Sequence, residues 1–227
     1  MFYKIAHRGA SGYLPENTLK SFQKAISLKA NAIELDVRLS KDGVPVIIHD
    51  KKINRLSQEK GLVKNKSLLE LEKLGFFSLE KILNNIPKKT IINIEIKEKK
   101  SIKPLINLLQ TLTQQNKIII NNFIISSFNF SILNYFHSLM PEIKIGMLVK
   151  RKFFLPFQKT AYLKKLKKIN AFSVHIHYKN ITPYLIQYFH QYNLLVFAYT
   201  INSKKKVLQL KKWKIDGIFS DYPDILS

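Results

Sequence analysis

The chain has 227 residues, of which 46% are hydrophobic, and carries a formal net charge of +23. This length and apolar content suffice for one large domain with a substantial core. The absence of cysteine excludes disulfides, zinc thiolates, iron–sulfur clusters and cysteine nucleophiles. No basic segment followed by an apolar run opens the chain, and no apolar stretch reaches the ~18 residues of a membrane span. We therefore expect a cytoplasmic protein.

The high positive charge has two interpretations. It can reflect nucleic acid or an anionic membrane surface as a partner, or a general bias of the composition toward lysine. Only four of the 38 basic residues are arginine, the side chain best suited to bidentate recognition of phosphates and bases. We therefore expect no nucleic-acid partner, but a field that attracts anionic substrates.

Short, β-branched apolar runs alternate with helical patterns along the whole chain. The expected strands are Tyr3–Ala6, Ala32–Val37, Thr90–Ile96, Phe123–Ser126, Lys144–Leu148, Ala171–His175, Leu195–Tyr199 and Gly217–Ser220. The expected helices are Asn17–Leu28, Ser101–Gln115, Ser131–Leu139, Thr160–Lys168, Pro183–Tyr192 and Ser203–Lys212. Continuous apolar strands that alternate with helices are typical of a parallel sheet covered on its faces. Eight of them predict an α/β fold, a (β/α)8 TIM barrel, with a doubly wound open sheet as the alternative.

One segment departs from this alternation. Asp42-Gly43 is a hairpin signal, and it is followed by the apolar run Val44–Ile48 and by two short helical patterns. The sequence therefore predicts one domain over residues 1–227 that contains a small insertion, approximately residues 44–85, after the second strand.

Charged and titratable side chains lie at or near the ends of four successive apolar runs: His7, Arg8, Glu34, Asp36, His49, Glu95 and Lys97. Glu34 and Asp36 are two residues apart on one strand, so their side chains point the same way. In a parallel barrel, catalytic groups gather where the strands end. Buried charges at such a rim are unfavourable unless they bind a metal or one another. We therefore expect these seven residues to form one site.

This set of residue types suits metal-assisted chemistry on a phosphate ester. Carboxylates bind a hard cation such as Mg²⁺ or Ca²⁺, basic groups bind phosphate oxygens, and histidines transfer protons near neutral pH. Each motif alone has a simpler explanation, because Glu34 and Asp36 could lie on a solvated strand face and Glu95 and Lys97 could be an ion pair. Their joint occurrence in a β/α pattern favours the active site.

Several blocks along the chain resemble the signature motifs of glycerophosphodiester phosphodiesterases. The first, residues 7–18 (HRGASGYLPENT), and the second, residues 33–43 (IELDVRLSKDG), are long and specific. Shorter matches are Val46–Asp50, Asn93–Lys97, Ser126–Phe128, Thr200–Asn202 and Asp216–Pro223. The resemblance implies a TIM barrel with a small insertion after its second strand. It also implies hydrolysis of glycerophosphodiesters to sn-glycerol 3-phosphate and an alcohol.

Residue by residue, the resemblance implies the following roles. Glu34, Asp36 and Glu95 would bind one divalent cation, Mg²⁺ or Ca²⁺. His7 and His49 would be the general acid and base, in an order that the sequence leaves open. Arg8 and Lys97 would hold phosphate oxygens.

Other positions modify this picture. Tyr199 stands where the family usually has tryptophan, so we expect an aromatic wall of the substrate pocket with an added hydroxyl. Lys29 stands where the family often has glycine, and a left-handed lysine there would cost about 1 kcal/mol. Residues 150–157 combine aromatic and basic side chains. This combination fits a loop packed over the barrel, which we favour, or a weak contact with an anionic membrane surface.

Two other functions therefore stay open at this point. One is a lysophospholipase D-like phosphodiesterase that acts at a membrane surface. The other is a non-catalytic basic binding module.

Overall fold

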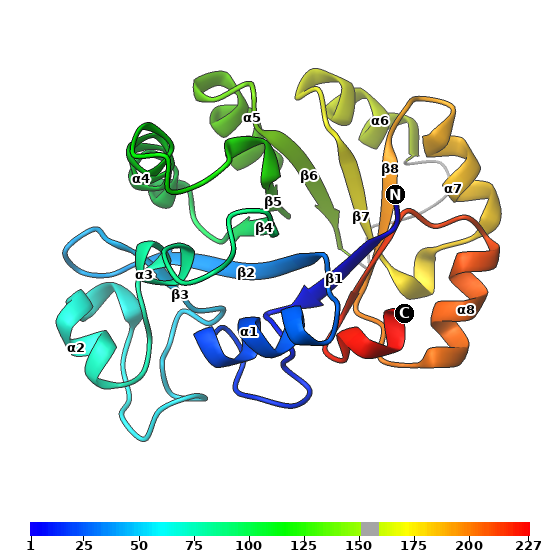
Figure 1. Cartoon of the computed structure of the whole chain (residues 1–227). Coiled ribbons are helices and arrows are strands. Elements are labelled where there is room, and N and C mark those ends of the chain that lie inside the picture. Colours follow the sequence, from blue (N-terminus) through cyan, green and yellow to red (C-terminus); the bar gives the residue numbers. More distant parts are fainter. Residues whose placement is uncertain (151–158) are drawn as a thin grey trace.

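The computed structural model describes residues 1–150 and 159–227. In it the predicted apolar runs are the strands of a closed parallel barrel (Figure 1). Its eight strands are β1 (Tyr3–His7), β2 (Ala32–Leu39), β4 (Ile91–Ile96), β5 (Phe123–Ser127), β6 (Lys144–Val149), β7 (Ser173–His177), β8 (Leu195–Tyr199) and β9 (Gly217–Ser220). Strand β1 pairs in parallel with β2 on one side and with β9 on the other, which closes the barrel. The predicted (β/α)8 barrel is thus confirmed, and the open sheet is wrong.

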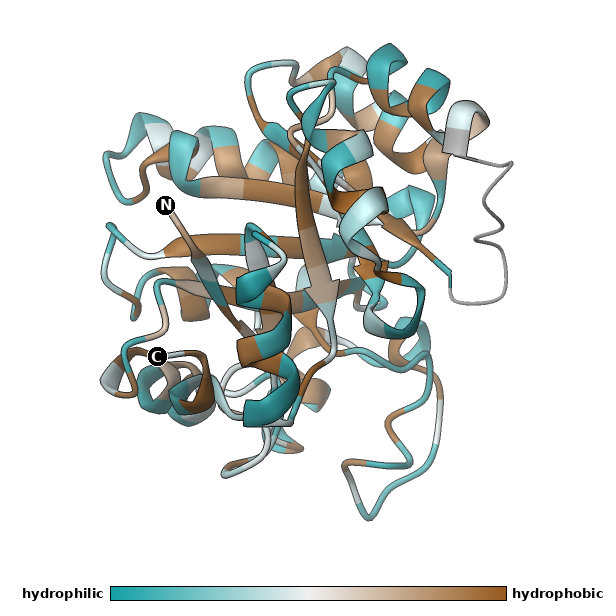
Figure 2. Cartoon of the chain, turned by 90° about the vertical axis from the view of Figure 1, so that its right-hand side faces the viewer, coloured by the Kyte–Doolittle hydropathy of each residue, from teal (hydrophilic) through white to brown (hydrophobic). Residues whose placement is uncertain are grey.

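Helices cover the outside of the barrel: α1 (Leu19–Ser27), α4 (Ile102–Gln114), α5 (Phe130–Leu139), α6 (Lys159–Lys168), α7 (Pro183–His190) and α8 (Lys204–Lys212). Their apolar sides face the strands, and their hydrophilic sides face outward (Figure 2). In α4 the buried side chains recur at helical spacing, as Leu105, Leu109 and Leu112 show. Helix α7 begins at Pro183, as predicted, and is capped by the Thr182 side chain, which accepts a hydrogen bond from the N–H of Leu185.

The first helix begins later than its sequence pattern predicts. Thr18 is the N-cap of α1, and its side chain accepts a hydrogen bond from the N–H of Ser21. Asn17, expected to be helical, has a left-handed backbone with φ of 57°. Its side-chain amide instead donates a 3.0 Å hydrogen bond to the Asp36 carboxylate. This tertiary contact outweighs the local helical preference.

The chain between β2 and β4 contains β3 (Pro45–Ile47), α2 (Leu68–Lys73) and α3 (Leu79–Leu83). Strand β3 pairs antiparallel with β2. Side chains from this segment form a small core of their own: Val46, Ile48, Ile53, Val63, Leu71 and Phe76. Helix α3, in contrast, packs Leu79 and Ile82 into the main core of the barrel. The exact limits of an insertion, and the single domain over residues 1–227, stay predictions.

Strand β7 runs two residues further than predicted, because its pairing with β8 continues to His177 opposite Tyr199. His175 is therefore inside the strand and fully buried, where its Nε2 lies 2.9 Å from the Ser173 hydroxyl. His177, in contrast, is the last residue of β7 and lines the cavity described below.

The predicted membrane contact of residues 150–157 falls on a segment that, apart from Lys150, lies outside the described residues. In the two described ranges, no helix combines the length and the apolar character needed to cross a bilayer.

Candidate active site

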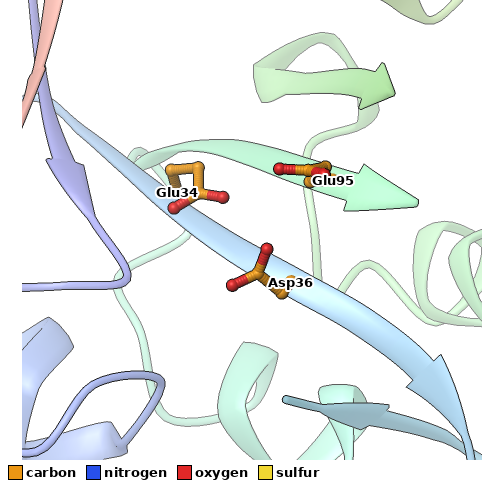
Figure 3. Close-up of side chains that lie close together, drawn as sticks. All are labelled: Glu34, Asp36 and Glu95. Atoms are coloured by element: carbon orange, nitrogen blue, oxygen red, sulfur yellow. The ribbon is translucent and has the colours of Figure 1, made fainter. Parts of the chain in front are cut away.

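Three carboxylates meet on one side of strands β2 and β4 (Figure 3). Asp36 lies directly opposite Glu95 in the pairing of these strands, and Glu34 is two residues earlier on β2. One oxygen of each of the three lies within 4.8 Å of the others. Exposed fractions of 3% for Glu34, 0% for Asp36 and 9% for Glu95 show that water contributes little to their solvation. The structure thus brings together the three residues predicted as metal ligands.

Burial and mutual repulsion set the protonation of this cluster. Burial and the charge of Asp36 raise the pKa of Glu34 to about 7. Burial would also raise the pKa of Asp36, but the charges of Lys97 and Arg8 outweigh it and lower this pKa to about 2. Burial and repulsion thus favour a proton on Glu34, whereas the neighbouring positive charges keep Asp36 ionised.

Arg8 and Lys97 are the positive groups in contact with the carboxylates. The Lys97 ammonium lies 2.7 Å from Asp36 Oδ1 and 2.5 Å from Glu95 Oε1. Arg8 lies 3.2 Å from Asp36 Oδ2 through Nε and donates through its backbone N–H to Glu34 Oε2 at 2.9 Å. Both predicted phosphate-binding residues are therefore at the site, where they act as counter-ions of the acids.

Arg8 takes this position because the chain turns sharply after β1. Arg8 has φ of 57° and Gly9 has φ of 85°. A Cβ on Gly9 would lie 2.3 Å from the Ser21 hydroxyl oxygen and 2.8 Å from a backbone carbon of Ser21. Only glycine accommodates both the backbone conformation and the close approach of α1.

The two predicted catalytic histidines both have a carboxylate on Nδ1. Asp221 Oδ1 lies 2.7 Å from Nδ1 of His7, and Asp50 Oδ1 lies 2.7 Å from Nδ1 of His49. Burial opposes protonation of His7, but the Asp221 bond and the charge of Glu34 outweigh it and raise its pKa above the usual value. For His49, burial prevails over the charge of Asp36 and lowers the pKa.

The site opens into a cavity of about 340 Å³, a size typical of small-ligand pockets. Its polar wall is formed by His7, Arg8, Glu34, His49, Asn93, Glu95 and Lys97. The cavity is also lined by apolar and aromatic residues, together with a third histidine: Phe128, Leu148, Tyr199, Phe219 and His177. The Tyr199 hydroxyl donates to the carbonyl oxygen of Val149 at 2.6 Å, which fixes the ring in the wall. Six of the seven predicted residues line the cavity, while Asp36 is fully covered by its neighbours.

Comparison with known proteins identifies the family. The model of the glycerophosphoryl diester phosphodiesterase family matches residues 7–225. The chain belongs to this family. A glycerophosphodiester phosphodiesterase of Caldanaerobacter subterraneus subsp. tengcongensis is 34% identical, and the alignment covers 98% of this chain and 95% of the relative. The corresponding enzyme of Bacillus altitudinis is 32% identical, with 97% of this chain and 94% of the relative covered.

Solved structures of glycerophosphodiester phosphodiesterases have the same fold. The enzyme of Thermotoga maritima superposes with a TM-score of 0.85 at 28% identity, over 99% of this chain and 96% of that chain. An Oleispira antarctica phosphodiesterase, solved with the product sn-glycerol-3-phosphate, also has a TM-score of 0.85, at 29% identity over 98% and 94%. The sequence-based assignment to a family of phosphodiester hydrolases is confirmed.

The structure also brings to the site three residues to which the sequence assigned no role: Glu16, Asn17 and Arg55. Asn17 donates to Asp36, and Glu16 lies 3.1 Å from Arg8. Arg55 joins Glu16 to Asp50 with three hydrogen bonds of 2.7–2.8 Å. The first two belong to the opening block of the family resemblance, so their position in that block was the only signal.

Proposed function

We propose that the chain hydrolyses glycerophosphodiesters to sn-glycerol 3-phosphate and an alcohol with the help of one divalent cation, Mg²⁺ or Ca²⁺. The observation that carries the proposal is the buried cluster of Glu34, Asp36 and Glu95 beside two imidazoles and two basic side chains. The product found in the Oleispira antarctica phosphodiesterase supports the same substrate class.

The charge balance of the cluster fits a divalent cation. When all three carboxylates are ionised, their negative charge exceeds the positive charge of Arg8 and Lys97 by one. This surplus would repel a phosphodiester anion. Adding a dication makes the balance positive by one, which suits a singly charged diester. The donor atoms are all carboxylate oxygens, which Mg²⁺ and Ca²⁺ prefer.

When bound, the cation would supply Lewis-acid stabilisation of phosphoryl oxygens. Arg8 and Lys97 would add positive charge next to the oxygens whose charge grows in the transition state. Of His7 and His49, one would accept a proton from the attacking hydroxyl or water, and the other would donate a proton to the departing alcohol. The carboxylate on each Nδ1 leaves Nε2 as the nitrogen for proton transfer.

The apolar side of the cavity would accommodate the carbon skeleton of the substrate. Tyr199 and Phe128 form its aromatic corner, with ring centroids 6.0 Å apart and planes at 85°. The Tyr199 hydroxyl is engaged by Val149, so the tyrosine would act through its ring face, as a tryptophan would.

A metal-dependent assay of product release tests the function. The purified chain, freed of metal with EDTA, would be given glycerophosphocholine, glycerophosphoethanolamine or lysophosphatidylcholine, with and without Mg²⁺ or Ca²⁺. We expect sn-glycerol 3-phosphate from the deacylated diesters only when a cation is added. No release with either cation would refute the proposal, and preferential cleavage of lysophosphatidylcholine would favour the lysophospholipase D-like alternative.

The other functions are less well supported. The membrane-surface alternative depended on residues 150–157, which lie mostly outside the described residues. A non-catalytic binding module would have no use for two imidazoles that are each held by a carboxylate beside the acid cluster.

A further inference from the structure

Asp221 lies behind one of the two imidazoles and is outside the set of site residues predicted from the sequence. It follows β9 directly, 214 residues after His7, and its Oδ1 lies 2.7 Å from His7 Nδ1. The closure of the barrel between β1 and β9 makes this contact. Asp221 is thus in place to act on His7 while contacting none of the three clustered acids.

The carboxylate of Asp221 is itself held from several sides. The Asn202 amide donates to Oδ2 at 2.5 Å, and the backbone N–H of Asp221 donates to Asn202 Oδ1 at 3.0 Å. The Ser11 hydroxyl lies 2.9 Å from Oδ1 and 2.8 Å from the carbonyl oxygen of His7, so it bridges the two residues. This network leaves the carboxylate little freedom to rotate.

An ionised carboxylate accepts hydrogen bonds and donates none. Burial would raise the pKa of Asp221, but the bonds from His7, Asn202 and Ser11 outweigh it and lower the pKa to about 2. The ring proton of a neutral His7 must then be on Nδ1, and Nε2 is the nitrogen left for substrate. Without this acceptor, imidazole could place its proton on either nitrogen.

We propose that Asp221 is a positioning residue that fixes the tautomer and ring orientation of His7, with Asn202 and Ser11 holding Asp221 in place. Asp50 stands in the same relation to His49, but it is the next residue in the chain and is tied to Arg55 on the protein surface. The carboxylate that contacts His7 comes instead from the residue after the last strand, β9. The expected effect of Asp221 on catalysis rests on the function proposed above, whereas its effect on the tautomer of His7 does not.

The test compares Asp221→Asn with the matched control Asp224→Asn. Asp224 is three residues further on, and its carboxylate accepts a hydrogen bond only from the exposed Tyr13 hydroxyl among the bonds of the described side chains. The asparagine at 221 can donate to Nδ1 and so favours the other tautomer. We expect kcat to fall about tenfold to a hundredfold or more in Asp221→Asn, with little change in KM. We expect no change in Asp224→Asn.

Long-range ¹H–¹⁵N NMR of the histidine side chains gives a readout that needs no substrate. We expect His7 to have its proton on Nδ1 in the wild type and in Asp224→Asn, and to shift toward the Nε2–H tautomer in Asp221→Asn. An unchanged tautomer, or an unchanged kcat in an active enzyme, would overturn the proposal. A wild type that has the expected tautomer but hydrolyses no diester would contradict the function and leave the positioning of His7 intact.

If Asp221→Asn does not fold, Asn202→Ala decides the question. It keeps the carboxylate and removes one of its donors, so we expect kcat to fall by about threefold or more. Unchanged kcat in this variant would overturn the proposal.

Discussion

Lys97→Met removes the ammonium that neutralises the acid cluster. Nζ of Lys97 lies 2.7 Å from Asp36 Oδ1 and 2.5 Å from Glu95 Oε1. The three side chains are only 10%, 1% and 11% exposed, respectively. Removing one partner from a buried ion pair typically destabilises a protein by about 3–5 kcal/mol. For a chain of this size that corresponds to a fall in Tm of roughly 6–20 °C. We expect this loss in EDTA, where no divalent cation can take the place of the ammonium.

A divalent cation should restore much of this stability. In the variant the cluster holds one more uncompensated negative charge than in the wild type, so it attracts the cation more strongly. We therefore expect excess Mg²⁺ to raise the Tm of Lys97→Met by more than it raises the Tm of the wild type. Thermal unfolding followed by circular dichroism, in EDTA and in Mg²⁺, measures both effects.

Lys100→Met is the matched control. Lys100 is half-exposed and lies 3.8 Å from Glu98, so its loss should change stability by less than about 1 kcal/mol. A Lys97→Met variant that is as stable in EDTA as this control would show that the ammonium does not stabilise the buried acids. Equal stabilisation of variant and wild type by Mg²⁺ would show that Lys97 and the cation do not share these acids.

Three further predictions address single residues. His49→Ala should lower turnover by about a hundredfold or more and leave Tm nearly unchanged; unaltered turnover would exclude a proton-transfer role. His175 is buried, which lowers its pKa to about 3. Below about pH 6.5 His175 is therefore protonated in the unfolded chain but neutral in the folded chain. Its contribution lowers the free energy of unfolding by about 1.4 kcal/mol per pH unit as the pH decreases from 6 to 4. Urea unfolding of His175→Gln at several pH values should give a slope of the unfolding free energy that is smaller by about 1.4 kcal/mol per pH unit, which corresponds to one proton. An unchanged slope would show that another group causes it. Lys29 has φ of 63°, so Lys29→Gly should raise the free energy of unfolding by up to about 1 kcal/mol, and a loss of stability in urea would contradict this.

The barrel could be predicted because its determinants are local. Each strand is a short apolar run, each helix has its own periodicity, and the end of a parallel strand is known once the strand is found. The same reasoning placed Glu34 and Asp36 on one face, and the family resemblance, with glycine often at this position, indicated the left-handed backbone of Lys29.

Other features depend on contacts between distant segments. The opposition of Asp36 and Glu95 follows from the register between β2 and β4, which neither strand determines alone. The contact of Asp221 with His7 requires barrel closure, and a single aspartate after a strand otherwise resembles a turn residue. Asn17 has a helical pattern around it, but its side chain binds Asp36 instead.

A crystal structure of the chain with Ca²⁺ would show where the cation binds, because the ion can be located by its anomalous scattering. We expect one ion about 2.3–2.6 Å from an oxygen of each of Glu34, Asp36 and Glu95, with the Lys97 ammonium displaced from at least one of its two carboxylates. Density for the ion elsewhere, with Lys97 still bound to both Asp36 and Glu95, would contradict this mode of binding.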